Sequence, residues 1–187
     1  DALLLQFAAR SEDFSDFGAT SNIKVAGRYS FGDLATLRGG YSTGFRAPTP
    51  GQSNYTGIVT SFDGPTGMQV QEGTVRPTDQ LAIDLGGAPL VPEEATNTSF
   101  GFTSSPIDNL SLTFDLYTID IVNKIIKSRS LAVENNPEFK KLAFYTNALD
   151  TKTSGYDLVL TYRMDNTNLG LAMNHNETKM VEHRKIG

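Results

Sequence analysis

The pattern in this chain that most resembles a reactive site is a serine between two glycines, GYSTG at residues 40–44. It fits the G-x-S-x-G pattern of a hydrolase nucleophile, and Asp and His residues follow later in the chain, in the order that such hydrolases use. That nucleophile needs a sharp turn from a strand into a helix. Here polar and apolar residues keep alternating through Ser42, and Pro48 and Pro50 follow in place of a helix. We therefore expect no catalytic residue and no enzyme, and a hydrolase built on Ser42 remains a minor alternative.

The residue types do not indicate a metal site, a cofactor site or a nucleic-acid interface. The two histidines, His175 and His183, do not have the i, i+4 spacing of a helical metal site, and the chain has no cysteine to complete a zinc site. The formal net charge of −5 leaves no strongly basic stripe for a nucleic acid. We expect no metal, no cofactor and no nucleic-acid partner.

Eight side chains are candidates for contact with a ligand. Six are charged residues within or at the ends of alternating segments, where they suit a wet interior, and two are aromatic residues of a long loop. They are Arg28, Arg38, Arg46, Tyr55, Phe62, Asp115, Asp157 and Arg163. The alternative for the charged residues is that they form ladders across neighbouring strands and act in stability. We favour this alternative for each charged residue.

The elements that must position these side chains are β-strands. In residues 110–121, Phe114 and Leu116 fall on one side and Thr113 and Asp115 on the other, because successive side chains of a strand point to opposite faces. The same alternation recurs along most of the chain. The seven predicted strands cover residues 3–13, 22–31, 35–46, 95–105, 110–121, 144–164 and 169–178.

The connections between these strands alternate in length. Short turns are predicted at 32–34, 106–109 and 165–168, and longer loops at 14–21, 47–94 and 128–143. In an up-and-down meander, this order puts every short turn at one end and every long loop at the other, which is the design of a bacterial outer-membrane barrel. Within the Gly- and Pro-rich loop 47–94, a short helix is expected between residues 77 and 85.

A soluble β-sandwich that binds a ligand or carbohydrate is the alternative fold, because its strands also alternate. It requires the apolar faces to pack on each other. Three features favour the barrel: strands longer than the usual five or six residues, charges in mid-strand, and aromatic residues gathered near both strand ends. The aromatic residues are Tyr29, Phe31 and Tyr162 near the short turns, and Tyr41, Phe45 and Tyr156 toward the long loops.

Four stretches carry recognisable motifs. They are YSTGFRAP (41–48), LVPEEATNTSFGF (90–102), PIDNLSLTFDLYTIDIVNKI (106–125) and YTNALDTKTSGYDLVLTY (145–162). Each resembles a segment of the TonB-dependent outer-membrane receptors, and they follow that family's order. In the last stretch Asn147, Gly155 and Asp157 match the family pattern. In the second, Ala95 stands where Ser or Thr is usual, and Ser99 stands where an acidic residue is frequent.

This resemblance implies an all-β antiparallel meander that is part of a large transmembrane barrel, seven strands out of about 22. Residues 1–187 would be a partial barrel domain, without the plug domain and the remaining strands, and loops 47–94 and 128–143 would be extracellular. The implied function is active uptake of a scarce nutrient, most simply a ferric siderophore or similar metal chelate, at the bacterial outer membrane. The implied partners are outer-membrane lipid, that small molecule, and the TonB complex acting through the plug.

Overall fold

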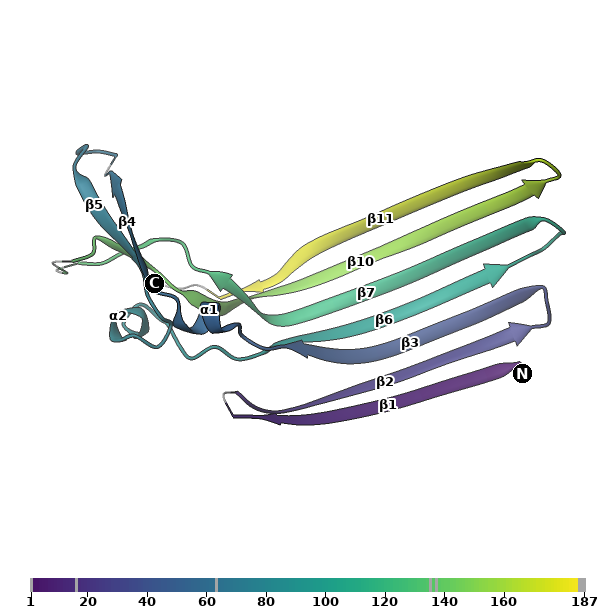
Figure 1. Ribbon diagram of the computed structural model, residues 1–187, viewed down its shortest axis with the longest axis horizontal. Coiled ribbons are helices and arrows are strands. Elements are labelled where there is room, and N and C mark those ends of the chain that lie inside the picture. Colours follow the sequence, from purple (N-terminus) through teal and green to yellow (C-terminus); the bar gives the residue numbers. More distant parts are fainter. Residues whose placement is uncertain (1, 16, 63, 135, 137, 185–187) are drawn as a thin grey trace. The chain divides into compact units, whose positions relative to one another are not determined.

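The main element of the computed structural model is a seven-stranded sheet whose strands follow the chain order, from β1 at the purple edge to β11 at the yellow edge (Figure 1). The structure describes residues 2–15, 17–62, 64–134, 136 and 138–184. The strands are β1 (Leu3–Phe14), β2 (Gly18–Phe31), β3 (Ala35–Arg46), β6 (Glu93–Ser104), β7 (Leu110–Lys127), β10 (Tyr145–Met164) and β11 (Thr167–His183). All seven predicted strands are confirmed, and the sheet is an up-and-down meander that is not closed within this chain.

The connection between β1 and β2 differs from the prediction of a longer loop at 14–21. Phe14 pairs directly with Gly18, so the strands reach much closer to each other than the loop would allow. Gly18 has φ of +86°, a left-handed conformation that glycine adopts without steric cost. The Ser- and Asp-rich composition therefore indicated a loop where the backbone makes a tight reversal. Asp16 lies outside the described residues.

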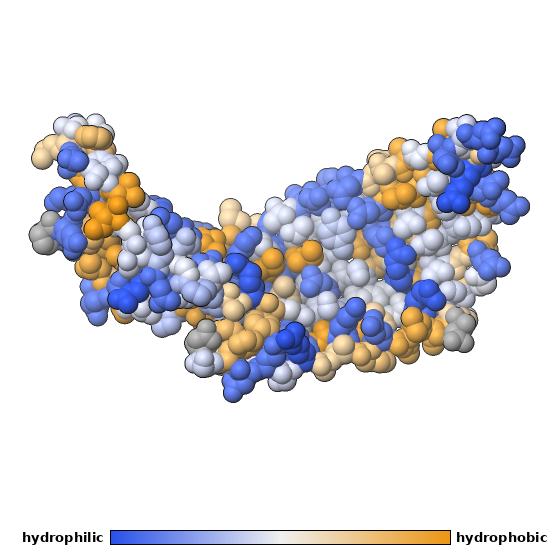
Figure 2. Space-filling view, viewed as in Figure 1, coloured by the Kyte–Doolittle hydropathy of each residue, from blue (hydrophilic) through white to orange (hydrophobic). Residues whose placement is uncertain are grey.

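Two compact units make up the chain. The first contains Asp1–Phe45, Glu94–Ile121 and Thr151–Val181, and the second contains Arg46–Glu93, Val122–Asp150 and Glu182–Gly187. In the first unit many apolar side chains of the strands are exposed; Leu5 is 57% exposed, Phe7 70% and Leu171 52%. Figure 2 shows hydrophobic residues at the surface along the lower edge, over β1. The buried hydrophobic residues among those described all belong to the second unit.

This exposure argues against the sandwich, because a sandwich would bury the apolar faces of its strands. Aromatic rings gather instead at both ends of the sheet. Phe14, Phe17 and Phe45 have ring centroids 4.5–6.0 Å apart at one end. Tyr29 and Phe31 lie 4.7 Å apart at the other. Such girdles are typical of strands that cross a membrane.

The second unit is formed largely by the two long loops, whose described residues form short strands and helices. Its four-stranded sheet has the order β4-β5-β9-β8. These strands are β4 (Gly57–Phe62), β5 (Gln69–Thr74), β9 (Lys141–Ala143) and β8 (Leu131–Ala132), and the helices are α1 (Pro50–Asn54) and α2 (Gln80–Ile83). The helix expected within 77–85 is thus confirmed as α2. Among the described residues, neither helix has the length and apolar character needed to cross a membrane.

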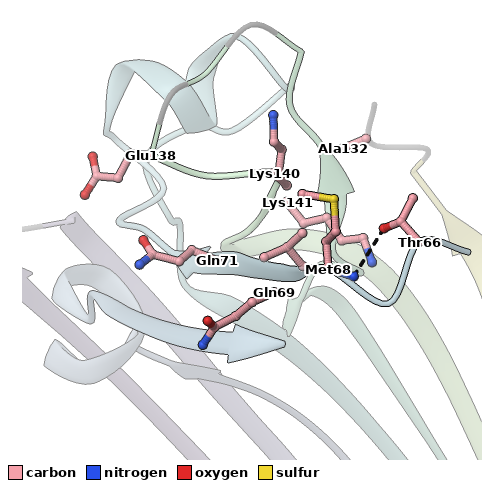
Figure 3. A pocket seen from close by; sticks show the side chains of 9 residues that line it. Thr66, Met68, Gln69, Gln71, Ala132, Glu138, Lys140 and Lys141 are labelled. Carbon is pink, nitrogen blue, oxygen red and sulfur yellow. Dashed lines mark hydrogen bonds between the residues drawn. The ribbon is translucent and has the colours of Figure 1, made fainter. Parts of the chain in front are cut away.

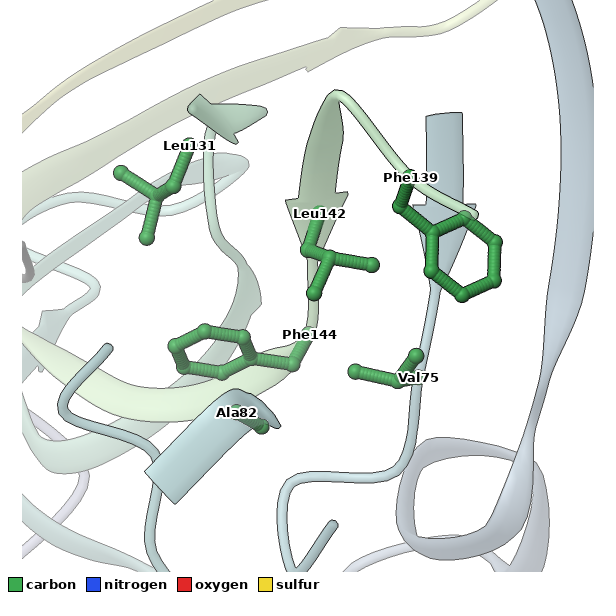
Figure 4. Packing of buried hydrophobic residues seen from close by; sticks show 6 residues of the cluster. All are labelled: Val75, Ala82, Leu131, Phe139, Leu142 and Phe144. Carbon is green, nitrogen blue, oxygen red and sulfur yellow. The ribbon is translucent and has the colours of Figure 1, made fainter. Parts of the chain in front are cut away.

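One hydrophobic core joins the two loops. It is built from Val75, Ala82, Leu131, Phe139, Leu142 and Phe144 (Figure 4). The first two residues come from the loop between β3 and β6, and the others from the segment between β7 and β10. Strands β5 and β9 pair in parallel beside this core, with Gly73 opposite Leu142. The loops therefore fold together, through contacts that neither could make alone.

Candidate functional site

An ion pair on the polar face of the large sheet spans three strands. Arg38 of β3 reaches across β6 to Asp115 of β7, with Nη2 lying 2.6 Å from Oδ2 and Nε 3.1 Å from Oδ1. Arg38 Nη1 also donates to Thr103 Oγ1 at 2.9 Å. Gly101 of β6 lies beneath the pair, and a Cβ there would come within 2.5 Å of Arg38 Nε and still closer to the Asp115 carboxylate. The glycine is what allows the two side chains to meet.

Gly101→Ala is therefore expected to break this pair. The added methyl group cannot fit under the two side chains, and overpacking of this kind costs about 1–3 kcal/mol. Both charges are partly exposed, 42% for Arg38 and 32% for Asp115, so their own coupling should be about 0.2–1 kcal/mol. A double-mutant cycle on Arg38 and Asp115 in the full-length protein should detect this coupling when residue 101 is the native glycine. The same cycle in the Gly101→Ala background should detect none.

The control for that cycle is Gly44→Ala, in the same β3 strand. A Cβ at Gly44 would have no heavy atom within 4 Å. This variant should keep both the stability and the coupling between the two charges. If Gly101→Ala leaves the coupling unchanged, the glycine is not what admits the pair.

Only some of the predicted charged residues come together. Arg28, Arg38 and Asp115 line one depression on the polar face, with a volume of about 370 Å³. Asp157 instead accepts a hydrogen bond from the Asn174 side chain on β11. Arg163 lies exposed at the end of β10. Cross-strand pairing, the explanation favoured from the sequence, therefore fits Arg38 and Asp115, whereas Arg28 has no ion pair or side-chain hydrogen bond with any described residue.

Arg46 makes a second ion pair, in the second unit. Its Nε donates to Glu93 Oε2 at 2.8 Å, its Nη2 donates to Oε1, and the backbone N–H of Ile125 donates to Oε1 at 2.7 Å. The Glu93 side chain is only 8% exposed. Burial acts to raise the pKa of Glu93, but the hydrogen bonds from Arg46 and Ile125 outweigh it and leave the pKa below its ordinary value. The pair ties the end of β3 to the start of β6, and Glu93 is also bound by β7 near the end of that strand, so Arg46 has a structural partner.

This shift predicts how the stability of the second unit depends on pH. Because the folded pKa is depressed, the pair stabilises the fold fully at neutral pH and loses that effect as the pH falls through the folded pKa. We expect Glu93→Gln to reduce amide hydrogen-exchange protection of the second unit at neutral pH. The difference from the wild type should vanish below the ordinary carboxylate range. Equal protection of the two proteins at neutral pH would contradict the assignment.

Asn147 has a role that the sequence did not indicate. Its Oδ1 accepts from the Val91 N–H at 2.9 Å, and its Nδ2 donates to the carbonyls of Val91 at 2.9 Å and Asn123 at 2.6 Å. Asn123 has φ of +57°, and its own N–H donates to Asp150 Oδ1 at 2.8 Å. The signal was present, because Asn147 is one of the residues that match the family motif. The Asn147 side chain links the end of the first long loop, at Val91, to the part of β7 that leads into the second, at Asn123.

A pocket of about 880 Å³ lies in the second unit and has one side from each loop (Figure 3). The first loop supplies Met68, Gln69 and Gln71, and the second supplies Lys140 and Lys141, among others. Lys141 Nζ lies 3.4 Å from Glu72 Oε1. The pocket offers amide, ammonium and thioether groups to a ligand. Sequence reasoning missed it because the two sides meet only through the shared fold.

The two aromatic loop candidates do not line this pocket. Tyr55 ends helix α1 and is 54% exposed, with its ring packed over Gly57. Phe62 ends β4 and is 71% exposed. Both remain available for contact at the surface of the second unit.

The serine of the G-x-S-x-G pattern does not form a catalytic turn. Ser42 lies inside β3, which continues to Arg46, so it is not at the strand-to-helix turn that a nucleophile needs. A helix does follow, contrary to the expectation from Pro48 and Pro50, but α1 begins only at Pro50, where proline suits the first turn. Within the described parts of the chain, no three His, Cys, Asp or Glu side chains are grouped so as to hold a metal ion. His175 instead lies beside the Tyr156 ring, with centroids 5.5 Å apart.

Comparison with known proteins gives both a family and similar structures. The family described as "TonB dependent receptor-like, beta-barrel" matches residues 1–179. The siderophore receptor PirA of Pseudomonas aeruginosa superposes with a TM-score of 0.70 at 18% identity, over 97% of this chain and 32% of that one. A mutant of the ferric enterobactin receptor PfeA of the same organism, in complex with enterobactin, gives 0.66 at 18%, over 97% and 25%.

A third similar structure is the RagAB peptide transporter. It gives a TM-score of 0.65 at 15% identity, over 97% of this chain and 21% of that one. A search of curated proteins gave no significant match. At these identities the solved structures establish the fold, and the chain spans between about a fifth and a third of their lengths.

Proposed function

The chain belongs to the TonB-dependent receptor β-barrel family, and from this premise we propose that it is part of a receptor that takes up a scarce nutrient, energised by TonB. Barrels of this family lie in the bacterial outer membrane, and the seven-stranded sheet is a segment of the barrel wall. The chain covers at most about a third of the length of the similar structures, so the transport cycle belongs to the whole protein.

The observation that carries the proposal is the contrast between the two faces of the sheet. One face exposes large apolar side chains such as Phe7 and Leu116, which is stable only against lipid. The other face carries charges, including the Arg38–Asp115 pair, which suits a wet interior. A soluble binding module would have to hide the first face, and among the described residues the first unit has no buried hydrophobic side chain.

A ferric siderophore or similar metal chelate is the substrate class that we propose. Support comes from the relatives: PirA is named a siderophore receptor, and PfeA is named a ferric enterobactin receptor and was crystallised with enterobactin. RagAB, named a peptide transporter, has the same fold, so fold alone does not set the substrate. We place loops 47–94 and 128–143 outside the cell, where the pocket of Gln71 and Lys140 would meet the nutrient first.

The test is uptake by the full-length receptor in a bacterial strain from which other iron receptors have been deleted. Growth on a panel of ferric chelates as the sole iron source, with radioactive iron to measure entry, should show at least one chelate that depends on this receptor. Deleting TonB should abolish that uptake. Uptake of peptides but of no ferric chelate would overturn the substrate class, and uptake that persists without TonB would overturn the energised mechanism.

A further inference from the structure

The pocket of the second unit involves the face of the four-stranded sheet that is turned away from the hydrophobic core. In β9 the Leu142 side chain is fully buried in that core, and the preceding residue, Lys141, points to the opposite face and lines the pocket. Ala132 of β8 pairs with Lys141 and lines the same pocket, and Val70 of β5 contributes from the first loop. The volume of about 880 Å³ lies in the range of small-molecule sites.

Two ammonium groups line this pocket, and they differ in how they are neutralised. Lys141 Nζ lies 3.4 Å from Glu72 Oε1, and Glu72 Oε2 accepts from Ser130 Oγ at 3.1 Å, so Lys141 already has a counter-charge that is held in place. The backbone N–H of Lys140 donates to Gln71 O at 3.1 Å, which fixes the start of its side chain. Within the described residues, the Lys140 ammonium has no ion pair or hydrogen bond. One positive charge at the pocket is therefore left for a ligand.

The acidic residue of the lining does not supply the missing counter-charge. Glu138 lines the pocket two residues before Lys140, and it makes no ion pair with any lysine or arginine that the structure describes. Its carboxylate points away from Lys140 (Figure 3). A ligand that brings a carboxylate oxygen to Lys140 would form a charge-assisted hydrogen bond, which is stronger than a neutral one.

The remaining side chains of the lining favour a ligand without aromatic rings. Gln69 and Gln71 offer carboxamides, which both donate and accept hydrogen bonds, and Met68 and Val70 offer apolar surface. Among the described residues, neither an arginine nor an aromatic side chain lines the pocket. Flat chelating groups such as catechols would gain most from aromatic faces or stacked guanidinium groups. Carboxylates and hydroxyls need only a positive charge and hydrogen-bonding groups, and these are present.

We propose that this pocket binds a ferric chelate of the non-aromatic hydroxycarboxylate class. Lys140 binds a carboxylate oxygen of the chelate, the amides of Gln69 and Gln71 bind its other carboxyl and hydroxyl oxygens, and Met68 packs against its carbon chain. The inference rests on the proposed uptake of a metal chelate, and it adds the chemical class of that chelate and the residues that recognise it.

Ferric citrate is the probe for this class, and ferric enterobactin is the aromatic comparison. Calorimetric titration of the purified full-length receptor should show ferric citrate binding that weakens about tenfold or more in Lys140→Gln, the loss expected for one charge-assisted hydrogen bond. Ala132→Phe, which fills the pocket without changing a charge, should weaken it as well. Neither substitution should weaken any binding of ferric enterobactin. Hydrogen exchange in β5 and β9 checks that each variant is still folded.

The matched control is Lys127→Gln, which removes an exposed lysine from the same unit, at the end of β7 and outside the pocket lining. It should leave ferric citrate binding unchanged. The inference is overturned if ferric citrate does not bind, or if it binds equally to the wild type, Lys140→Gln and Ala132→Phe. If a different ferric chelate is then taken up through TonB, the proposed function still stands. If no ferric chelate is taken up, both are overturned.

Discussion

Arginine in place of Leu116 is expected to destabilise the barrel by about 2–4 kcal/mol, the cost of a charge on the lipid face near the bilayer midplane. Leu116 lies in the middle of β7 and is 44% exposed, so the chain itself does not cover it. In the full-length receptor the arginine would have to lose its hydration in lipid. The variant should accumulate poorly in the outer membrane and unfold at lower urea concentration than the wild type.

The matched control is Thr113→Arg, in the same strand but on the opposite face. There the guanidinium would meet the wet side of the sheet, near Asp115, so we expect a change within about 0.5 kcal/mol. Urea unfolding of both variants in lipid vesicles measures the difference. Equal loss of stability in the two variants would mean that the two faces of β7 are not exposed to different solvents, lipid on one side and water on the other.

The second large effect is expected from Phe144→Ala in the core of the second unit. Phe144 is fully buried, at 0% exposure, and truncation of a buried phenylalanine costs about 3–5 kcal/mol. Because the core joins both loops, hydrogen exchange should accelerate in β5 and in β8 and β9 together. The bonds to follow are Lys140 N–H to Gln71 O at 3.1 Å and Val75 N–H to Ala143 O at 3.0 Å.

Phe62→Ala is the control for the core variant, because the same side chain is removed from the surface of the same unit. Phe62 is 71% exposed, so its loss should leave exchange in both loops near the wild-type rate. Acceleration confined to 128–143 in Phe144→Ala, with β5 still protected, would show that the loops open independently. The pocket of Met68 and Lys140 would then have two separately mobile sides.

The strands were predictable because each contains enough alternation to fix its two faces. The bounds predicted for β3, Ala35–Arg46, are those of the structure. Strands β7 and β11 were predicted in the right places but are longer than predicted. Periodicity is a local signal, and these strands repeat it many times. At Gly18 the prediction was wrong for a different reason. The composition of residues 14–21 indicated a loop, whereas the positive φ of Gly18 allows a much shorter connection.

The fold of the loops could not be predicted in the same way. Strand β9 has three residues and β8 has two, too few for a period to appear. The parallel pairing of β5 with β9 joins segments that are far apart in the sequence, and nothing in either segment alone specifies its partner. The core residues Val75 and Leu142 stand among Gly, Pro and charged residues, so their burial emerges only when the loops pack together.

For the candidate site, the sequence indicated residue types but not partners. The charged residues were expected to form ladders across neighbouring strands, with no particular pair predicted. Arg38 and Asp115 instead pair across an intervening strand, which depends on the missing side chain of Gly101. Tyr55 and Phe62 were chosen as aromatic residues of a long loop, and the pocket instead uses Gln71 and Lys140. Long-range geometry, rather than residue chemistry, decided these outcomes.

Strand β7 separates lipid from a wet interior if its two faces differ in solvent, and single-cysteine labelling measures that difference most directly. The chain has no native cysteine. In the full-length receptor in membranes, cysteines are introduced one at a time at Leu112, Phe114 and Leu116 on one face, and at Ser111, Thr113 and Asp115 on the other. The first set should react with a lipid-soluble thiol probe and the second with a water-soluble one. Resistance of the first set to both probes would place that face in a protein core and contradict the account.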